Sequence, residues 1–156
     1  MTPAIVIARE DPLDPDLKIL HERHTFAMHE ETPPESIHML PADALRAPGI
    51  DFFAMRIAGR PVGMGALKRL DAAHGEIKSM HVLAEERGQG LARRMLDHLI
   101  AEARAAGYQR LSLETGVQPG FASARRLYAQ SGFAECGPFE GYWDDPNSLF
   151  MTLVLA

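Results

Sequence analysis

The sequence predicts a single three-layer α/β domain in which helices cover both faces of a mixed, mostly antiparallel sheet. Two observations support this fold class. Strand-like segments dominate the middle of the chain, and segments with helical apolar spacing lie before, between and after them, in the order β-α-α-β-β-β-α-β-α-β-β. The chain has 156 residues, 46% apolar and 24% charged, which is enough to bury one sizeable core. We therefore expect residues 1–156 to form one domain.

The first third of the chain predicts a strand and two helices. A short strand is expected from Pro3 to Ala8. Asp14 followed by Pro15 has the pattern of an N-cap and a first helical position. A helix of about 16 residues should follow, because four residues recur at helical intervals: Leu17, Leu20, His24 and Met28. The run 32–34, Thr-Pro-Pro, ends it, and residues 41–47 predict a short second helix.

The rest of the chain alternates strands with two longer helices. Strands are predicted at 52–58, 62–68, 74–82 and 110–114, from residue 133 onward, and at 148–155. The first two flank Gly59-Arg60-Pro61 and should form a hairpin. Helices are predicted at 91–106 and 121–131, where Gly107 and Gly132 supply the C-terminal stop.

Composition excludes several classes of function. The formal net charge is −5, so no basic surface is expected that would hold a nucleic-acid backbone. There is no run of roughly 18 apolar residues and no signal-peptide pattern, so we expect no membrane partner. The single cysteine, Cys136, cannot form an internal disulfide, which fits a reducing, cytoplasmic location, and no activating pattern marks it as a nucleophile.

The most informative segment is the loop at residues 87–92, before the helix at 91–106. Gly88 and Gly90 lack a Cβ, so a ligand can approach the backbone closely. The loop N–H groups and the positive end of the helix dipole then converge on one spot that suits a pyrophosphate. A glycine turn that merely opens a surface helix is the alternative. The spacing matches neither a Walker loop nor a dinucleotide fingerprint.

Three motifs in order resemble the GNAT superfamily of acyl-CoA-dependent N-acyltransferases. Arg87-x-x-Gly90-x-Ala92 is similar to its (R/Q)-x-x-G-x-(G/A) signature. The strand 76–82 resembles the one that precedes this loop, and residues 124–133 match the family's A-x-x-L-Y-x-x-x-G-F helix. The resemblance covers roughly residues 50–155 and implies the three-layer fold. It also implies that strands 76–82 and 110–114 run parallel and splay apart around the pantetheine arm of coenzyme A.

The resemblance implies acetyl-CoA as the acyl donor and a set of cofactor contacts. The pyrophosphate should meet the loop residues Arg87, Gly88, Gln89, Gly90, Leu91 and Ala92, mainly through backbone amides. The pantetheine should lie beside strand residues Met80, His81 and Val82. Many members carry Asn where this chain has Phe121, so Ser123 or Arg125 is expected to replace that contact.

The resemblance also implies two catalytic residues, Tyr128 and Glu76. Tyr128 lies at the motif position whose hydroxyl donates to the leaving thiolate, with a half-buried packing role as the alternative. Glu76 is the predicted general base, since burial near the sheet raises a carboxyl pKa. Its alternatives are a solvated strand-end carboxylate or a cross-strand partner of Lys68 or Arg69, and Glu114 is the rival base. His81 is a further candidate base, although a packing role is the commoner one.

Strict alternation along strand 76–82 predicts two faces. Glu76, Lys78, Met80 and Val82 should share one face, and Ile77, Ser79 and His81 the other.

Two other features leave alternatives open. Seven histidines invite a metal site, but His21-Glu22-Arg23-His24 is one residue short of a zinc-binding H-E-x-x-H pattern, and no metal is expected. The aromatic, acidic segment 138–147 either closes over an amine substrate or forms an Asx-rich turn that holds the last hairpin.

The sequence as a whole predicts transfer of an acetyl group from acetyl-CoA to the primary amine of a small-molecule or amino-acid-like acceptor. The alternatives are acetylation of a protein N-terminus or lysine, and a non-catalytic coenzyme A-binding regulatory module. Retention of both Glu76 and Tyr128 argues against the module. A homodimer is compatible with the sequence.

Overall fold

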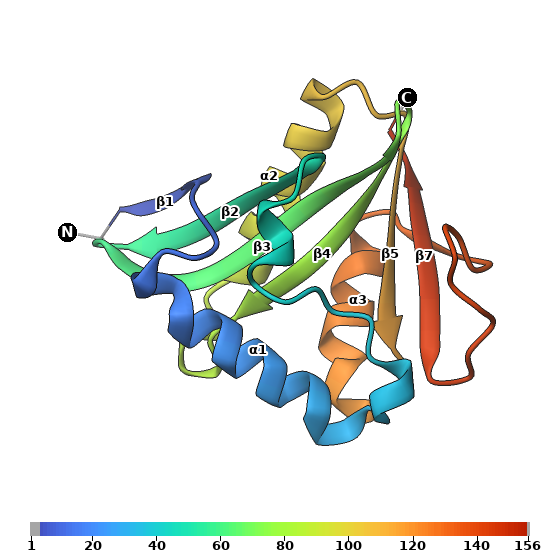
Figure 1. Cartoon of the computed structure of the whole chain (residues 1–156), viewed down its shortest axis with the longest axis horizontal. Coiled ribbons are helices and arrows are strands. Elements are labelled where there is room, and N and C mark those ends of the chain that lie inside the picture. Colours follow the sequence, from blue (N-terminus) through green and yellow to red (C-terminus); the bar gives the residue numbers. More distant parts are fainter. Residues whose placement is uncertain (1–3, 156) are drawn as a thin grey trace.

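The computed structural model describes residues 4–155, which build one seven-stranded sheet with helices on both faces (Figure 1). The strand order is β1-β2-β3-β4-β5-β7-β6, and every neighbouring pair is antiparallel except β4 and β5. The predicted mixed, mostly antiparallel sheet is therefore confirmed. The strands are β1 (Ile5–Arg9), β2 (Ile50–Ile57), β3 (Arg60–Asp71), β4 (His74–Val82), β5 (Arg110–Gly116), β6 (Ala134–Cys136) and β7 (Ser148–Val154).

Three helices complete the layers. Helix α1 (Lys18–Glu31) crosses one face, and α2 (Leu91–Ala105) and α3 (Ala122–Gln130) lie behind the other (Figure 1). Each face buries its own apolar cluster. The α1 side contains Leu17, Leu20, Phe52, Met64 and Leu83, and the α2/α3 side includes Ile77, Met95, Leu99, Leu113 and Tyr128. Burial on both faces of the central strands makes the fold the predicted three-layer one.

The first third of the chain differs from the sequence prediction in three places. Pro3, the expected start of the first strand, lies outside the described residues, and β1 begins at Ile5. The turn Pro15–Leu17 is a 3-10 helix, so α1 begins at Lys18. The Asp14 side chain accepts from the Asp16 N–H and so caps the 3-10 turn. The helix expected at 41–47 is only a 3-10 turn at Ala44–Arg46, since the chain leaves it in an extended conformation at Ala47.

The predicted hairpin forms with a tighter turn than the sequence indicates. Ala58 and Gly59 have φ values of 51° and 83°, so they form the two-residue connection, and Arg60 and Pro61 already belong to β3. Two successive positive φ values match the twist of the flanking strands, which lets β2 and β3 pair from Ile50 to Ile57.

Strands β4 and β5 separate along their length. Their parallel pairing joins residues 74–76 to residues 110–112 and stops there, although β4 continues to Val82 and β5 to Gly116. The two strands visibly diverge in Figure 1. This confirms the splayed parallel pair and leaves backbone groups of β4 facing an open wedge.

A bulge at Ser79 overturns the predicted alternation along β4. Ser79 has a φ of 54°, and the register with β3 shifts between Met64 and Ala66. One extra residue reverses the side-chain phase beyond it. Met80 and Val82 therefore pack with Ile77 on the α2 side, while the His81 ring packs at a tilt against His24 of α1. Strict alternation would have placed Met80 and Val82 with Glu76.

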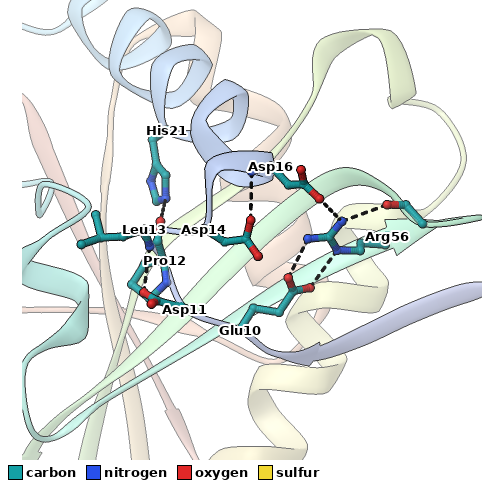
Figure 2. Close-up of polar contacts among 9 residues, drawn as sticks. Glu10, Asp11, Pro12, Leu13, Asp14, Asp16, His21 and Arg56 are labelled. Atoms are coloured by element: carbon teal, nitrogen blue, oxygen red, sulfur yellow. Dashed lines mark hydrogen bonds and ion pairs between the residues drawn. The ribbon is translucent and has the colours of Figure 1, made fainter.

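An ion cluster fixes the start of α1 against the sheet. Figure 2 shows Arg56 of β2 bridging Glu10 and Asp16. Its guanidinium binds Glu10 at 2.7 Å and Asp16 at 3.0 Å, with Arg56 20% exposed. These carboxylates raise the pKa of Arg56 further above its usual range, so the cluster stays charged. A few residues later, His21 donates to the carbonyl of Pro12 at 2.8 Å. Helix α1 is thereby held across the sheet in a defined place.

Candidate functional site

A cleft of about 880 Å³ opens where β4 and β5 diverge. Its walls come from α1, β4, β5, the loop before α2 and the start of α3. The predicted site residues that line it are Glu76, Met80, His81, Val82, Arg87, Gly88, Gly90, Leu91, Ala92, Ser123 and Tyr128. Residues from three separate motifs are thus gathered around one cavity. Such a concave, partly apolar cavity with a few convergent polar groups is the usual form of a ligand site.

The glycine loop forms one end of the cleft. Gly88 and Gly90 have φ values of 87° and 74°, and no atom lies within 4 Å of where a Cβ would sit on either. Gly90 is the N-cap of α2 and has no side chain to cap the helix. The first N–H groups of α2 are therefore free of side-chain capping at this end, where Arg87 and Arg93 also line the cleft. This combination favours an anionic ligand group.

Gln89 and Arg125 lie outside the residues that line the cleft. The Gln89 amide donates to the backbone and side chain of Glu86, both at 3.1 Å. The Arg125 guanidinium donates to the carbonyls of Gly116 at 2.8 Å and Gln118 at 3.0 Å. Arg125 therefore ties the end of β5 to the start of α3. Of the two residues expected near the missing asparagine contact, Ser123 is the one that lines the cleft.

The middle of the cleft contains a pair of neutral imidazoles. His81 of β4 and His24 of α1 have ring centroids 5.3 Å apart. Burial lowers the pKa of His24 to about 3, with a further contribution from His81. Burial, followed by the Arg87 and Arg23 charges, lowers the pKa of His81 to about 4. Both rings are neutral at neutral pH and contribute polar but uncharged lining.

The far end of the cleft is acidic. Glu76 is 2% exposed and accepts a hydrogen bond from the Tyr142 hydroxyl at 2.5 Å. Its other close partner is the Lys78 ammonium at 3.5 Å. Neither Lys68 nor Arg69, its expected cross-strand partners, forms an ion pair with it within the described part of the chain. Glu114 lines the same region, and burial raises the pKa of its carboxyl above the ordinary value.

Tyr128 of α3 lines the cleft between these two ends. It is 8% exposed and packs edge-on against Phe133. Burial, and secondarily Glu114, raises the pKa of its phenol to about 12. No hydrogen bond joins its hydroxyl to another group among residues 4–155, so the proton is available to a ligand.

The segment 138–147 forms the Asx-rich turn that was one of the two alternatives, and none of its residues lines the cleft. Asp145 accepts from the N–H of Asn147 at 2.9 Å, which makes an Asx turn before β7. Tyr142 and Trp143 both pack edge-on against His38. The segment therefore shapes the last hairpin and packs against Glu76, Lys78 and His38, which line the acidic end of the cleft.

Sequence reasoning placed Lys78 on the same face as Glu76 but gave it no role there. It missed His38 and Tyr142, the other two groups of this cluster. Tyr142 is 66 residues away along the chain, and only the tertiary fold brings it to Glu76.

Residues 4–155 contain no group of three or more His, Cys, Asp or Glu side chains that could hold a metal ion. In the same part of the chain, no helix is long and apolar enough to cross a membrane.

Comparison with known proteins identifies relatives along nearly the whole chain. The model of the acetyltransferase (GNAT) family matches residues 16–133. The N-acetyltransferase YsnE of Bacillus subtilis is 48% identical over 136 residues, covering 87% of this chain and 90% of that protein. The IAA acetyltransferase of Azospirillum brasilense is 41% identical over 154 residues, covering 98% and 99%.

Solved structures have the same fold. The crystal structure of an acyl-CoA N-acyltransferase from Klebsiella pneumoniae superposes on this chain with a TM-score of 0.79 at 29% sequence identity, covering 97% of this chain and 98% of that one. The YncA acetyltransferase of Salmonella typhimurium, solved with acetyl-CoA, has a TM-score of 0.73 at 21% identity, covering 98% and 95%.

Proposed function

Because this chain belongs to the acetyltransferase (GNAT) family, we propose that it transfers an acetyl group from acetyl-CoA to the primary amine of a small-molecule or amino-acid-like acceptor. One observation carries the proposal. A single cleft has the glycine loop of α2 at one end and the carboxylates of the buried Glu76 and the half-buried Glu114 at the other. A donor bound at the loop and an amine bound beside the carboxylates would meet within it. Acetyl-CoA in the Salmonella relative supports the identity of the donor.

The cofactor would lie along the loop and the wedge. Its pyrophosphate would accept hydrogen bonds from backbone N–H groups of residues 87–92, with Arg87 adding charge. Its pantetheine arm would run along the part of β4 that no longer pairs with β5, in the manner of an added strand. Met80 and Val82 line this stretch, and Ser123 lies across the wedge at the start of α3.

The reaction makes three demands of the protein. The amine must be neutral when its nitrogen attacks the thioester carbon, so that a C–N bond forms and the C–S bond breaks. In our proposal Glu76 takes the proton that the amine loses. The departing thiolate accepts a hydrogen bond from Tyr128, whose raised pKa keeps its proton in place. Holding the two substrates together in the cleft supplies a large share of the rate.

Glu114 is the alternative base. Its carboxyl also lines the cleft, and no cation lies within 4.0 Å of it among residues 4–155. A carboxyl whose pKa is raised by burial is better matched to proton transfer at neutral pH. We favour Glu76 because it lies deeper and has a defined set of polar partners.

A small acceptor fits the closed side of the cleft better than a protein chain does. The segment around His38 packs against Tyr142 and Trp143, and the Asn147 amide donates to Ser36 at 3.3 Å. These contacts hold both segments against the residues of the acidic end, whereas a polypeptide acceptor would need an open groove there. We also propose a cytoplasmic location, supported by the unpaired Cys136.

A screen of amines tests this function. The protein is incubated with acetyl-CoA and a panel of amino acids, amino-acid amides, diamines and arylalkylamines, and coenzyme A is followed through its free thiol. We expect at least one primary amine to accelerate thiol release well above hydrolysis and to yield an N-acetylated product by mass spectrometry. IAA, which gives the Azospirillum relative its name, is included as a further acceptor. Absence of turnover with every small amine, together with turnover of peptides, would move the acceptor class to proteins.

The same assay separates the two candidate bases. Glu76→Gln should lower the rate at neutral pH by about 10²-fold or more, with a deficit that shrinks at alkaline pH, where more amine is already neutral. Glu114→Gln is the matched control, because it makes the same change on the neighbouring strand. A pH-dependent deficit in Glu114→Gln, with a flat profile in Glu76→Gln, would assign the base to Glu114.

A further inference from the structure

Glu76 belongs to a buried polar cluster assembled from three distant parts of the chain. The Lys78 ammonium donates to the Tyr142 hydroxyl at 2.9 Å and to the His38 carbonyl at 2.9 Å. The Tyr142 hydroxyl in turn donates to Glu76 Oε2 at 2.5 Å. The result is a chain of contacts that runs from Lys78 through Tyr142 to Glu76, with Lys78 also 3.5 Å from the same oxygen.

The burial of this cluster makes each partner matter. The side chains of Lys78 and Glu76 are 9% and 3% exposed. A buried carboxylate without partners is strongly unfavourable, and loss of one partner leaves the other charge uncompensated. The Tyr142 ring is itself held in place by edge-on or tilted contacts with Phe139 and Phe150, so its hydroxyl has a fixed position.

The contacts distinguish the two oxygens of Glu76. Both the Tyr142 hydroxyl and the Lys78 ammonium approach Oε2. Among residues 4–155 no hydrogen bond reaches Oε1, although Glu76 lines the cleft. The protein therefore binds Oε2 and leaves Oε1 able to contact a ligand in the cleft.

We propose that Tyr142, held by Lys78, is a positioning residue that fixes Oε2 of Glu76 and leaves Oε1 to receive the proton of the acceptor amine. The inference rests on the proposed role of Glu76 as the base. In the proton transfer the N–H bond of the amine breaks and an O–H bond forms at Oε1, while Tyr142 keeps its own proton. Burial and the neighbouring Glu76 charge both raise the pKa of the Tyr142 phenol, so Tyr142 acts only as a donor to the carboxylate.

Several charged or titratable groups act on Glu76 together. Lys78 and His74 lie on its own strand, and Glu114 lies on β5. His38 and Tyr142 approach from the two covering segments. Burial lowers the pKa values of His38 and His74, so Lys78 supplies the positive charge of the group at neutral pH. A hydroxyl removed from Tyr142 changes the hydrogen bonding of Glu76 without changing any of these charges.

The test is Tyr142→Phe, which keeps the ring and removes the hydroxyl. The substrate is the primary amine that gives the highest rate in the screen. Its acetylation at neutral pH should slow about tenfold, because the hydrogen bond to the Glu76 carboxylate is lost. The acid limb of the pH–rate profile should move about one unit toward higher pH, because the carboxylate loses a stabilising donor. The KM for acetyl-CoA should stay unchanged, because Tyr142 does not line the cleft.

A second readout needs no acceptor. Protein labelled with ¹³C-glutamate is titrated, and the Glu76 carboxyl resonance is identified by its loss in Glu76→Gln. Its pH midpoint should rise in Tyr142→Phe and stay in place in the matched control Tyr108→Phe, since among residues 4–155 the Tyr142 hydroxyl donates to Glu76 and the Tyr108 hydroxyl does not. An unmoved midpoint in Tyr142→Phe would overturn the inference.

The double variant distinguishes this inference from the function on which it rests. If Tyr142 acts only through Glu76, then Glu76→Gln combined with Tyr142→Phe is no slower than Glu76→Gln alone. A further tenfold loss in the double variant shows that Tyr142 acts independently and defeats the inference, with the base role intact. An unchanged rate in Glu76→Gln alone defeats the base role instead.

Discussion

Tyr128 of α3 and Glu114 of β5 both line the cleft, and burial shifts the pKa values of both in the same direction. Burial raises the pKa of each, and the Glu114 charge raises that of Tyr128 further, to about 12. A phenol with that pKa is a hydrogen-bond donor throughout the range in which amines are acetylated. It cannot serve as a base there. The electrostatics of the site therefore support the donor role toward a thiolate.

Tyr128→Phe should lower kcat by about 10- to 100-fold, since the lost donor acts where charge develops. Binding of acetyl-CoA should change little, because the intact thioester sulfur accepts hydrogen bonds weakly. Steady-state kinetics and calorimetric titration with acetyl-CoA measure the two quantities. Equal losses in kcat and in affinity would instead make Tyr128 a packing residue beside Phe133.

Motif spacing predicted which single residues gather around the cleft, and it failed where the contact is purely tertiary. Glu76, Gly90 and Tyr128 lie on three motifs whose relative placement follows from the fold. The Lys78–Tyr142 contact joins residues 64 apart, and no local pattern encodes it. Arg125 was expected near the cofactor from its place in the motif, but two backbone carbonyls engage its guanidinium.

Among the elements, β4 shows what local patterns can and cannot predict. Its bounds, His74–Val82, agree with the sequence prediction, because composition and flanking turns define a strand well. The bulge at Ser79 has no such signature, because residues 76–82 contain no glycine to mark its positive φ of 54°. One inserted residue turned His81 toward α1, and that contact now couples the helix to the sheet.

This contact predicts how stability depends on pH. In the folded protein the pKa values of His24 and His81 are lowered to about 3 and about 4. In the unfolded chain both should titrate near 6.5. Below pH 6.5 the unfolded chain therefore binds more protons, and stability falls by up to about 1.4 kcal/mol per pH unit for each histidine, until the folded pKa is reached.

Urea unfolding at several pH values between 7.5 and 4.5 measures this slope. His24→Leu should make the slope shallower, by about one proton, because one buried imidazole no longer differs between the two states. His29→Leu on the exposed side of the same helix is the control and should keep the wild-type slope. The same slope in His24→Leu and in wild type would show that the pKa of His24 is not lowered on folding.

The whole molecule is organised around the wedge between two halves of one sheet. Strands β1 to β4 carry α1 on one face, and β5, β7 and β6 complete the sheet beyond the wedge (Figure 1). Apart from the helix expected at 41–47, the order of elements was predictable from periodicity, whereas the divergence of β4 and β5 followed only from family resemblance. The sequence pattern of two parallel strands does not indicate the residue at which their pairing stops. A ligand that fills the wedge would replace the missing contacts between the halves.

Binding of acetyl-CoA in the wedge between β4 and β5 should therefore raise the thermal stability of the protein. If acetyl-CoA binds only the folded chain, a concentration 100 times its Kd should raise Tm by about 5–10 °C. Gly90→Val should abolish the shift, because a side chain at the N-cap would obstruct the loop N–H groups.

Gly107→Val is the matched control. Both glycines have positive φ, 74° and 85°, and neither has an atom within 4 Å of its Cβ position, so backbone strain should lower both apo Tm values alike. Gly107 follows α2 at its far end and does not line the cleft, so that variant should keep the full acetyl-CoA shift. Loss of the shift in both variants would mean that general destabilisation, rather than obstruction of the loop, governs cofactor binding. Retention of the shift in Gly90→Val would show that the pyrophosphate does not bind at residues 87–92.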